Sequence, residues 1–257
     1  MSIVLKSARE LDLMRQAGRI VAEVLQLMGE VIAPGVTTAD LNAAADALIR
    51  KRGATPSFKG YHGFPASICT SVNEQVVHGI PSKKRVLKEG DLVSVDVGAI
   101  YKGYHGDAAM TYCVGGTLCT SPEQQRLMGI TQIALAAAIE QARSGNRLWD
   151  IIRAIETTVH SAGYDVLRNY AGHGIGREMH EDPSIPNSLS DPRGRPLNVL
   201  LRPGMTLAIE PMVAVGSGEP RVLKDNWTVV TADGTLSAHF EHTIAVRNGE
   251  AEILTRL

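Results

Sequence analysis

Cysteine is scarce in this sequence, and neither sign of charge dominates. The 257 residues include three cysteines, Cys69, Cys113 and Cys119, an odd number without the spacing of a metal-binding motif. This usage fits a reducing compartment better than a disulfide framework. The 26 basic and 27 acidic residues give a formal net charge of -1, which provides no field that attracts nucleic acid or an anionic membrane. We therefore expect neither DNA nor a membrane as a partner.

Long apolar runs are also missing, and those present are far too short to span a bilayer. The amino-terminal stretch MSIVLKSARELDLMRQAGR becomes charged early and has no apolar region followed by a small-residue cleavage site. We therefore expect a cytoplasmic protein. With 44% hydrophobic residues, the chain can bury a substantial core, as one large domain or as two fused halves.

Capping residues and apolar periodicity predict four helices. Ser7 and Glu10 form a capping-box pattern ahead of apolar positions at helical spacing, and Pro34-Gly35 ends this first helix. The second helix is expected from residue 37 or 38 through 52, and the fourth from about 148 to 162. The third begins at residue 121 or 122, with proline at its first position, and runs to about 143.

The sequence also repeats itself. PGVTTADLNAAADALIRKRGA, from residue 34, aligns without gaps with SGNRLWDIIRAIETTVHSAGY, from residue 144, at an offset of 110. YHGF at residue 61 then meets GHGI at 172, and EGDLVSVDV at 89 meets PGMTLAIEP at 203, so that Asp96 falls on Glu210 at an offset of 114. Chance similarity between short helices is the alternative. Agreement in order, spacing and acid position favours a duplicated unit, with halves at about residues 1–120 and 121–257 of one domain.

Two aspartates interrupt a hydrophobic stretch, LVSVDVGAIYKGYHGDAAMTYCV, that reads as a hairpin around a Lys102-Gly103 turn. A two-residue turn at this place pairs residues whose numbers sum to 205, so Asp96 faces Ala109 and Asp107 is its diagonal neighbour on the same face. Two carboxylates side by side in an apolar hairpin indicate a bound cation.

Four acids lie inside apolar strands, namely Asp96, Asp107, Glu210 and Glu241, and no lysine or arginine is interleaved with them. The alternative is that each faces solvent on a separate strand. If they converge, two divalent cations would balance their charge. His173, in the glycine-rich stretch AGHGIGREMHEDP, adds one imidazole, and His180 follows seven residues later. Carboxylates with imidazole suit manganese, iron, cobalt or zinc, and a metal pair that shares a hydroxide predicts hydrolysis.

With these residues identified, the chain resembles the type I methionine aminopeptidases, in the bacterial form without an amino-terminal extension. The matching stretches are YHGFPASICTSVNEQVVHGIP, GDLVSVDVGAIYKGYHGDAAMTY, GHGIGREMHEDPSIPN, GMTLAIEPM and SAHFEHTIAV. The resemblance implies the α/β pita-bread fold, a pseudo-twofold architecture in which two helix pairs cover a central antiparallel sheet. It implies removal of the initiator methionine from nascent chains with a small second residue, by attack of a metal-bridging hydroxide on the first peptide bond.

The resemblance also implies residue roles. Two divalent metal ions (Co, Mn, Fe, Zn or Ni) would be held by Asp96, Asp107, His173, Glu210 and Glu241, with Asp107 and Glu241 bridging. His78 would contact the scissile amide, His180 would stabilise charge at the substrate carbonyl, and Glu210 would carry the proton to the leaving amine. The substrate's amino group would coordinate one metal, which would restrict the reaction to chain termini.

The methionine side chain would fit an apolar pocket made of Tyr61, Phe64, Cys69, Met179 and Trp227. Phe64 replaces a frequent tyrosine of the family and Met179 a frequent phenylalanine, and Phe58 stands where a small residue is common. These departures put the size of the pocket in doubt but not the chemistry. Methionine and aromatic walls both suit a thioether.

Three further expectations concern partners and alternatives. We expect a monomer, and the basic run Lys83-Lys84-Arg85 with Lys88 to be a solvated loop, although transient proximity to the ribosome is a hypothesis. A prolidase or Xaa-Pro aminopeptidase is the first rival, but the helices begin by about residue 7, which we expect to leave no room for the additional domain of those enzymes. A non-catalytic binding module is the second rival, and it would have lost metal ligands.

Overall fold

The four predicted helices form close to their expected positions in the computed structural model, which describes residues 3–116, 120–192, 194 and 196–257. They are α1 (Ala8–Val31), α2 (Thr38–Lys51), α3 (Pro122–Gln141) and α4 (Leu148–Ser161). The side chains of Ser7, Thr37 and Ser121 each accept a hydrogen bond from the third residue of their helix, as the capping pattern predicts. The third helix ends at Gln141 rather than near residue 143.

Strands form most of the other regular elements. In the described part of the chain they are β1 (Thr55–Pro56), β2 (Ile68–Val72), β3 (Gln75–Val77), β4 (Leu92–Tyr101), β5 (Tyr104–Cys113), β6 (Asp165–Val166), β7 (Ala171–Gly174), β8 (Glu181–Pro186), β9 (Thr206–Ile209), β10 (Met212–Ala214), β11 (Pro220–Val222), β12 (Val229–Thr231), β13 (Ser237–His239), β14 (His242–Ala245) and β15 (Glu252–Ile253), with a short 3₁₀ turn, η1, at Tyr61–Gly63. The long β4–β5 hairpin has the predicted register, since Asp96 pairs with Ala109 across the sheet.

Every strand pairing among the described residues is antiparallel. In the first half, β4 lies between β2 and β5 and also pairs with β1; in the second half, the order is β15–β14–β9–β7–β8. A further ladder, β13–β10–β6, continues the second half, and β11–β12–β3 forms a small separate sheet. The β9–β14 and β10–β13 ladders keep one register on both sides of a break at Glu210 and Glu241, because Ile209 pairs with His242 and Met212 with His239.

The strand pairs of the two halves repeat at the offsets found in the sequence. Thr55 pairs with Ile100 in the first half, and Asp165 pairs with Ala214 in the second, which are shifts of 110 and 114. The two isolated bridges are related by the same shifts of 110 and 114, because Thr37 pairs with Val86 in the first half and Arg147 pairs with Leu200 in the second. The pseudo-twofold α/β architecture predicted from the repeat is therefore confirmed.

One segment of the predicted alignment is wrong. The sequence comparison equated YHGF at residue 61 with GHGI at 172, but Tyr61–Gly63 is a 3₁₀ turn outside the sheet. The strand that pairs with β4 beside Asp96 is β2, where Cys69 is the partner of Asp96. In the second half β7 pairs with β9 as β2 pairs with β4 in the first half, so β7 corresponds to β2 and not to the segment at residue 61. The shared His-Gly pair aligned two segments whose backbones differ.

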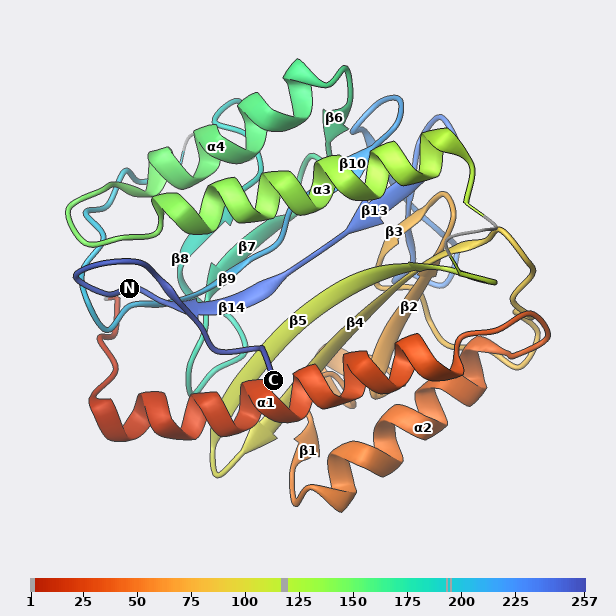
Figure 1. The fold of residues 1–257 in the computed structure, drawn as a ribbon, viewed down its shortest axis with the longest axis horizontal. Helices are drawn as coiled ribbons and strands as arrows, with labels where there is room; N and C mark the ends of the chain where they lie inside the picture. Colours follow the sequence, from red (N-terminus) through yellow and green to blue (C-terminus); the bar gives the residue numbers. More distant parts are fainter. Residues whose placement is uncertain (1–2, 117–119, 193, 195) are drawn as a thin grey trace.

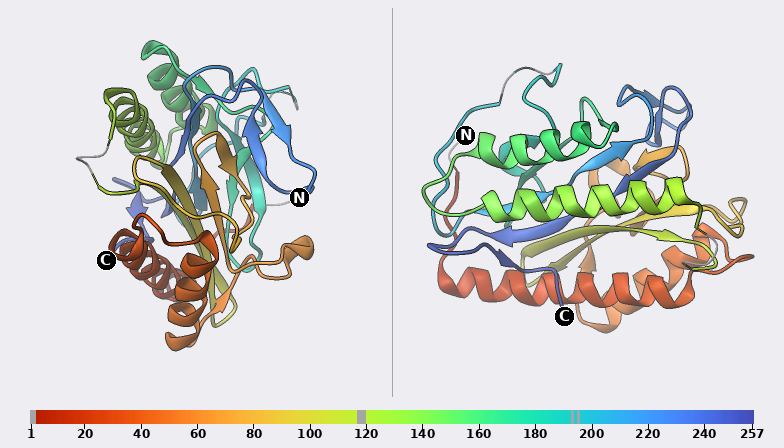
Figure 2. Two further views of the ribbon diagram at one scale, coloured as in Figure 1. Left: turned by 90° about the vertical axis from the view of Figure 1, so that its right-hand side faces the viewer. Right: turned by 45° about the horizontal axis from the view of Figure 1, so that its top comes forward.

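The two helix pairs lie on one side of the curved sheet, as Figures 1 and 2 show. Helix α1 packs against the apolar face of β4, where Val93, Val95 and Val97 are buried. Alternation along the strand sends Ser94 and Asp96 to the opposite face. The acids therefore lie on the side of the sheet that the helices leave free.

Threonine hydroxyls join the two halves where β5 meets β13 and β14. The Thr243 hydroxyl accepts a hydrogen bond from the Asp107 N–H at 3.0 Å and donates one to the Asp107 carbonyl at 2.8 Å. The Thr111 hydroxyl does the same with His239, at 2.9 Å for both bonds. The acids of the two halves thus meet across a fixed boundary.

Two of the three cysteines are described. Cys69 and Cys113 are free, Cys69 being buried and Cys113 half-buried, while Cys119 lies outside the described residues. No helix in the described ranges combines the length and the apolar character that crossing a membrane would need.

Candidate metal centre

Asp96 and Asp107 come from adjacent strands of the hairpin and lie on one face, as predicted. Asp107 pairs with Gly98, so Asp96 is its diagonal neighbour. One oxygen of each carboxylate, Asp96 Oδ1 and Asp107 Oδ1, is buried without a hydrogen-bond partner. A buried acceptor left in this state costs about 1–3 kcal/mol unless a ligand satisfies it.

His173, Glu210 and Glu241 approach the aspartates from the second half. His173 lies in β7, Glu210 follows the last residue of β9, and Glu241 precedes the first residue of β14. The His173 Nε2 atom is 3.6 Å from Glu210 Oε1 and 3.8 Å from Asp107 Oδ2. Asp107, His173 and Glu241 each offer one ligand atom, and all three atoms lie within 4.8 Å of one another. The side chains predicted to hold metal therefore converge.

The backbone fixes the orientation of His173. Its Nδ1 lies 2.8 Å from the Gly174 carbonyl, which can only accept, so Nδ1 carries the proton and Nε2 presents its lone pair to the carboxylates. A Cβ on Gly172 would lie 2.4 Å from the Ala208 carbonyl oxygen. Glycine is therefore required where β7 approaches β9, and this closeness brings the ring to Glu210.

Burial dominates the electrostatics of the cluster. It raises the pKa of Asp96 to about 7, and it raises the pKa of Asp107 and Glu241 well above the ordinary range, where neighbouring carboxylates add to the effect. Burial lowers the pKa of His173 to about 3, so the imidazole is neutral. In the described residues no lysine or arginine forms an ion pair with Asp96, Asp107 or Glu241.

The donor set fits divalent metal ions. Carboxylate oxygens and a neutral imidazole are ligands for Mn, Fe, Co, Ni and Zn, and cations would satisfy the buried oxygens that have no hydrogen bond. Cys69 lies next to Asp96 across the sheet, but burial raises the pKa of its thiol, so it stays protonated and is a poor ligand.

A cavity of about 200 Å³ opens from these residues. All of the side chains predicted for the site line it, as does Phe58: Asp96, Asp107, His173, Glu210, Glu241, His78, His180, Tyr61, Phe64, Cys69, Met179 and Trp227. Its apolar end is a cluster of Phe58, Phe64, Cys69 and Met179, with Trp227 packed against it. The Phe64 and Trp227 rings meet edge to face at 5.1 Å between centroids.

Two neutral histidines stand at the cavity. Burial, with a contribution from His180, lowers the pKa of His78 to about 4, and burial also lowers the pKa of His180. His180 Nδ1 lies 2.7 Å from the Tyr61 hydroxyl, and the His180 ring is 4.2 Å from the His173 ring between centroids. His78 has φ 59°, a left-handed conformation that costs a non-glycine residue about 1–3 kcal/mol. The surrounding packing therefore holds His78 in place.

The sequence reasoning missed two histidines of the site. His62 lines the cavity, and it belongs to the matching stretch YHGF. His239 is 1% exposed, and neither ring nitrogen has a hydrogen-bond partner. Its Nε2 lies 3.8 Å from Glu210 Oε2 and 4.0 Å from Glu241 Oε2. The signal was present, because alternation along a strand puts residue 239 on the same face as Glu241.

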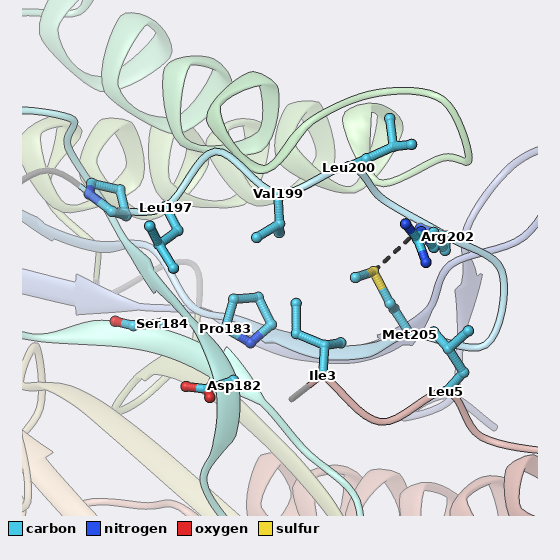
Figure 3. A pocket seen from close by; sticks show the side chains of 11 residues that line it. Ile3, Leu5, Asp182, Pro183, Ser184, Leu197, Val199, Leu200, Arg202 and Met205 are labelled. Atoms are coloured by element: carbon cyan, nitrogen blue, oxygen red, sulfur yellow. Dashed lines mark hydrogen bonds between the residues drawn. The ribbon is translucent and has the colours of Figure 1, made fainter. Parts of the chain in front are cut away.

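Two other cavities differ in their relation to the metal centre. One of about 190 Å³ shares His78, Asp96, His180 and Glu210 with the metal centre and continues past Tyr170. The other, of about 690 Å³, holds none of the predicted site residues; Figure 3 shows Ile3 and Leu5 beside Pro183 and Met205 in its wall. Only the smaller of the two therefore extends the centre.

Comparison with known proteins agrees with this geometry. The family model described as metallopeptidase family M24 matches residues 12–248. A methionine aminopeptidase of Clostridium acetobutylicum is 52% identical over 253 residues, covering 98% of both chains. The crystal structure of a methionine aminopeptidase from Thermotoga maritima has a TM-score of 0.94 at 47% identity, covering 100% of both chains. A prolidase from Pyrococcus furiosus has a TM-score of 0.79 at 24% identity, covering 99% of this chain and 66% of its own, which shows a shared fold alone.

Proposed function

The chain belongs to metallopeptidase family M24 and has the pita-bread fold, and from this we propose that it removes the amino-terminal methionine from polypeptides with a small second residue by hydrolysing the first peptide bond. One observation carries the proposal. A single cavity joins a cluster of carboxylates and imidazole to an apolar wall of Phe64, Cys69, Met179 and Trp227. A thioether side chain suits that wall, and the amide bond next to it would lie at the polar end.

Two divalent ions would be held by Asp96, Asp107, His173, Glu210 and Glu241, with Asp107 and Glu241 shared between them. Bound there, they would supply a hydroxide nucleophile at neutral pH and polarise the substrate carbonyl. The charge of four carboxylates and the buried oxygens without hydrogen bonds support two ions rather than one. Which of Co, Mn, Fe, Zn or Ni is used depends on availability as well as on the ligands.

The protein's own groups would then handle the proton and the developing negative charge. Glu210 would take the proton of the attacking water and deliver it to the leaving amine. Burial raises the pKa of the Tyr61 hydroxyl, so Tyr61 keeps its proton and can donate it in a hydrogen bond to His180 Nδ1. In this arrangement the proton of the neutral His180 ring is on Nε2, which points away from Tyr61. The neutral His180 would then donate to the substrate carbonyl oxygen, and the neutral His78 to the scissile amide.

The substrate panel tests this function. Protein stripped of metal and reloaded with Mn²⁺, Co²⁺ or Fe²⁺ should release methionine from a Met-Ala-Ser peptide and leave Met-Lys and amino-blocked peptides intact. Elemental analysis of the same samples gives the number of ions per chain. Efficient cleavage of Xaa-Pro peptides would refute the proposal in favour of the prolidase alternative, and inactivity of metal-loaded protein on every peptide would favour the non-catalytic one.

We also propose that the chain acts as one catalytic unit, with halves divided near residue 120, as a cytoplasmic monomer whose substrates are nascent polypeptides. Lys83, Lys84 and Lys88 are exposed in a loop, which supports a solvated surface and leaves transient contact with ribosomal RNA as a hypothesis. Sedimentation with ribosomes tests it: association at low salt that high salt abolishes is expected, and absence from the pellet at every salt concentration would count against it.

A further inference from the structure

We propose that Lys6, on the segment that precedes α1, is a positioning residue for His180, which it holds in place through Glu181. The turn between β7 and β8 carries Met179 and His180 into the cavity, and Glu181 follows directly. This inference rests on the role proposed above for His180. It assigns a function in the reaction to a residue that is remote from the cavity lining.

Lys6 makes a buried ion pair. Its Nζ donates to Glu181 Oε2 at 2.5 Å, and the side chains are 4% and 14% exposed. The backbone of Lys6 is fixed as well, because its N–H donates to the Gly204 carbonyl at 2.8 Å. The residues just before it, Ile3 and Leu5, lie beside Pro183 and Met205 in Figure 3. The amino-terminal segment therefore packs along the second half of the molecule and delivers one cation to Glu181.

The second oxygen of Glu181 holds the turn itself. Glu181 Oε1 accepts hydrogen bonds from the Arg177 N–H at 2.9 Å and from the Glu178 N–H at 3.3 Å. The carboxylate thus has three donors, two from the backbone of the turn and one from Lys6. With the lysine removed, the charge would stay partly buried without its cation, a situation that strongly destabilises the local structure.

Close packing makes the lysine stem part of the same support. A Cβ on Gly176 would lie 2.4 Å from Lys6 Cε and 2.5 Å from Glu181 Oε1. The Gly176 carbonyl also accepts a hydrogen bond from the His105 N–H at 2.9 Å, which ties the turn to β5. The turn is therefore held from the first half through His105 and from the amino-terminal segment through Lys6.

His180 depends on this support because, among the described residues, only one hydrogen bond orients its ring, the 2.7 Å contact of Nδ1 with the Tyr61 hydroxyl. Its backbone position comes from the turn. A displacement of about 1 Å at a catalytic group can lower a rate by about 100-fold. Loss of Lys6 should therefore lower kcat through His180. The proposed metal ligands should keep their positions, because none of them lies in the turn and His173 belongs to β7.

The test is a double-mutant cycle with His180. Lys6→Met keeps the length of the stem and removes the charge, and we expect it to lower kcat on Met-Ala-Ser at least tenfold, with unchanged metal content by elemental analysis. In a His180→Ala background the same substitution should change kcat less than twofold, because the group that it positions is gone. Arg15→Met is the matched control. It removes a cation that pairs with Asp12 and Glu252, and should leave kcat unchanged.

Equal effects of Lys6→Met in both backgrounds would show a general structural role and overturn the inference, as would a kcat within twofold of the parent. If Lys6→Met does not fold, as judged by thermal unfolding, Glu181→Gln provides the same cycle with the same expected non-additivity. Full activity of His180→Ala alone would instead refute the role of His180 in the proposed function, and the role of Lys6 with it.

Discussion

Replacing Asp96 by asparagine should make the metal-free protein gain stability relative to the parent as the pH rises. Burial raises the pKa of the Asp96 carboxyl from 3.8 to about 7. The folded protein therefore binds this proton more tightly than the unfolded chain does. The stability that the proton provides is fully present below the unfolded pKa of 3.8 and is lost as the pH rises through about 7.

The expected magnitude follows from these two pKa values. Their difference corresponds to about 4 kcal/mol in the free energy of unfolding, of which about 2.5 kcal/mol is lost between pH 5 and pH 8. Histidines act in the opposite direction, since burial lowers the pKa of His173 and His239 to about 3, and folding then gains stability as the pH rises through the acidic range. Both proteins share this contribution, so it cancels in their difference. Removing the Asp96 charge also relieves Asp107, with the same sign.

Urea unfolding in EDTA at pH 5 and pH 8 measures the effect. Relative to the parent, Asp96→Asn should gain about 2.5 kcal/mol between the two pH values. A difference that stays constant within about 0.5 kcal/mol would refute the reasoning, because the carboxyl would then titrate alike in both states. Mn²⁺ at 100 times its dissociation constant should stabilise the parent by about 2.7 kcal/mol and the variant by less.

Three further substitutions separate metal binding, catalysis and substrate binding. Asp107→Ala should abolish turnover and bound metal together, so metal retained in elemental analysis would contradict its assignment as a ligand. His180→Ala should lower kcat by about 100- to 1000-fold at unchanged metal content, which is the usual cost of losing one hydrogen-bond donor to a developing oxyanion. A smaller loss of kcat in steady-state kinetics would argue that another residue is the donor. Phe64, 4% exposed and in edge contact with Trp227, shapes the apolar wall. Phe64→Ala should therefore raise KM for Met-Ala-Ser about tenfold, or about 1.4 kcal/mol, and an unchanged KM would exclude this wall as the methionine pocket.

Local rules explain why the hairpin could be predicted from the sequence. Lys102 and Gly103 both adopt positive φ, at 47° and 81°, as a two-residue hairpin turn requires. Once that turn is placed, the register of the strands has no freedom, and Asp96 must face Ala109. The helices were predictable for the same reason, since their capping residues lie within a few positions of the groups that they bind.

Contacts between distant segments could not be derived in this way. Nothing in the sequence indicates that Lys6 reaches Glu181, because the pair depends on how the amino-terminal segment crosses the second half. The alignment of YHGF with GHGI failed for a related reason. The histidine of a His-Gly pair can adopt a left-handed conformation, as His62 does with φ 49°, or lie in a strand, as His173 does. The identity of the two residues does not distinguish these backbones.

The register of the repeat would have identified His239. A shift of 114 carries Gly98 of β4 onto Met212 of β10. Asp107 is the cross-strand partner of Gly98 and His239 is the partner of Met212, so His239 occupies the place of Asp107 in the second half. The boundary between the halves obeys the same symmetry, since Thr243 holds the backbone of Asp107 as Thr111 holds that of His239.

Glu241 has no acidic counterpart in the first half. Asp96 corresponds to Glu210, Ala109 faces Asp96, and Glu241 faces Glu210, so the residue that corresponds to Glu241 is Ala109. The second half therefore brings Glu210 and Glu241 directly opposite each other at a break in the ladder, whereas the first half sets its two acids diagonally in a continuous one. Duplication of the fold thus fixes the positions of the backbone, and the departures from symmetry at Glu241 and His239 make the two sides of the metal centre chemically different.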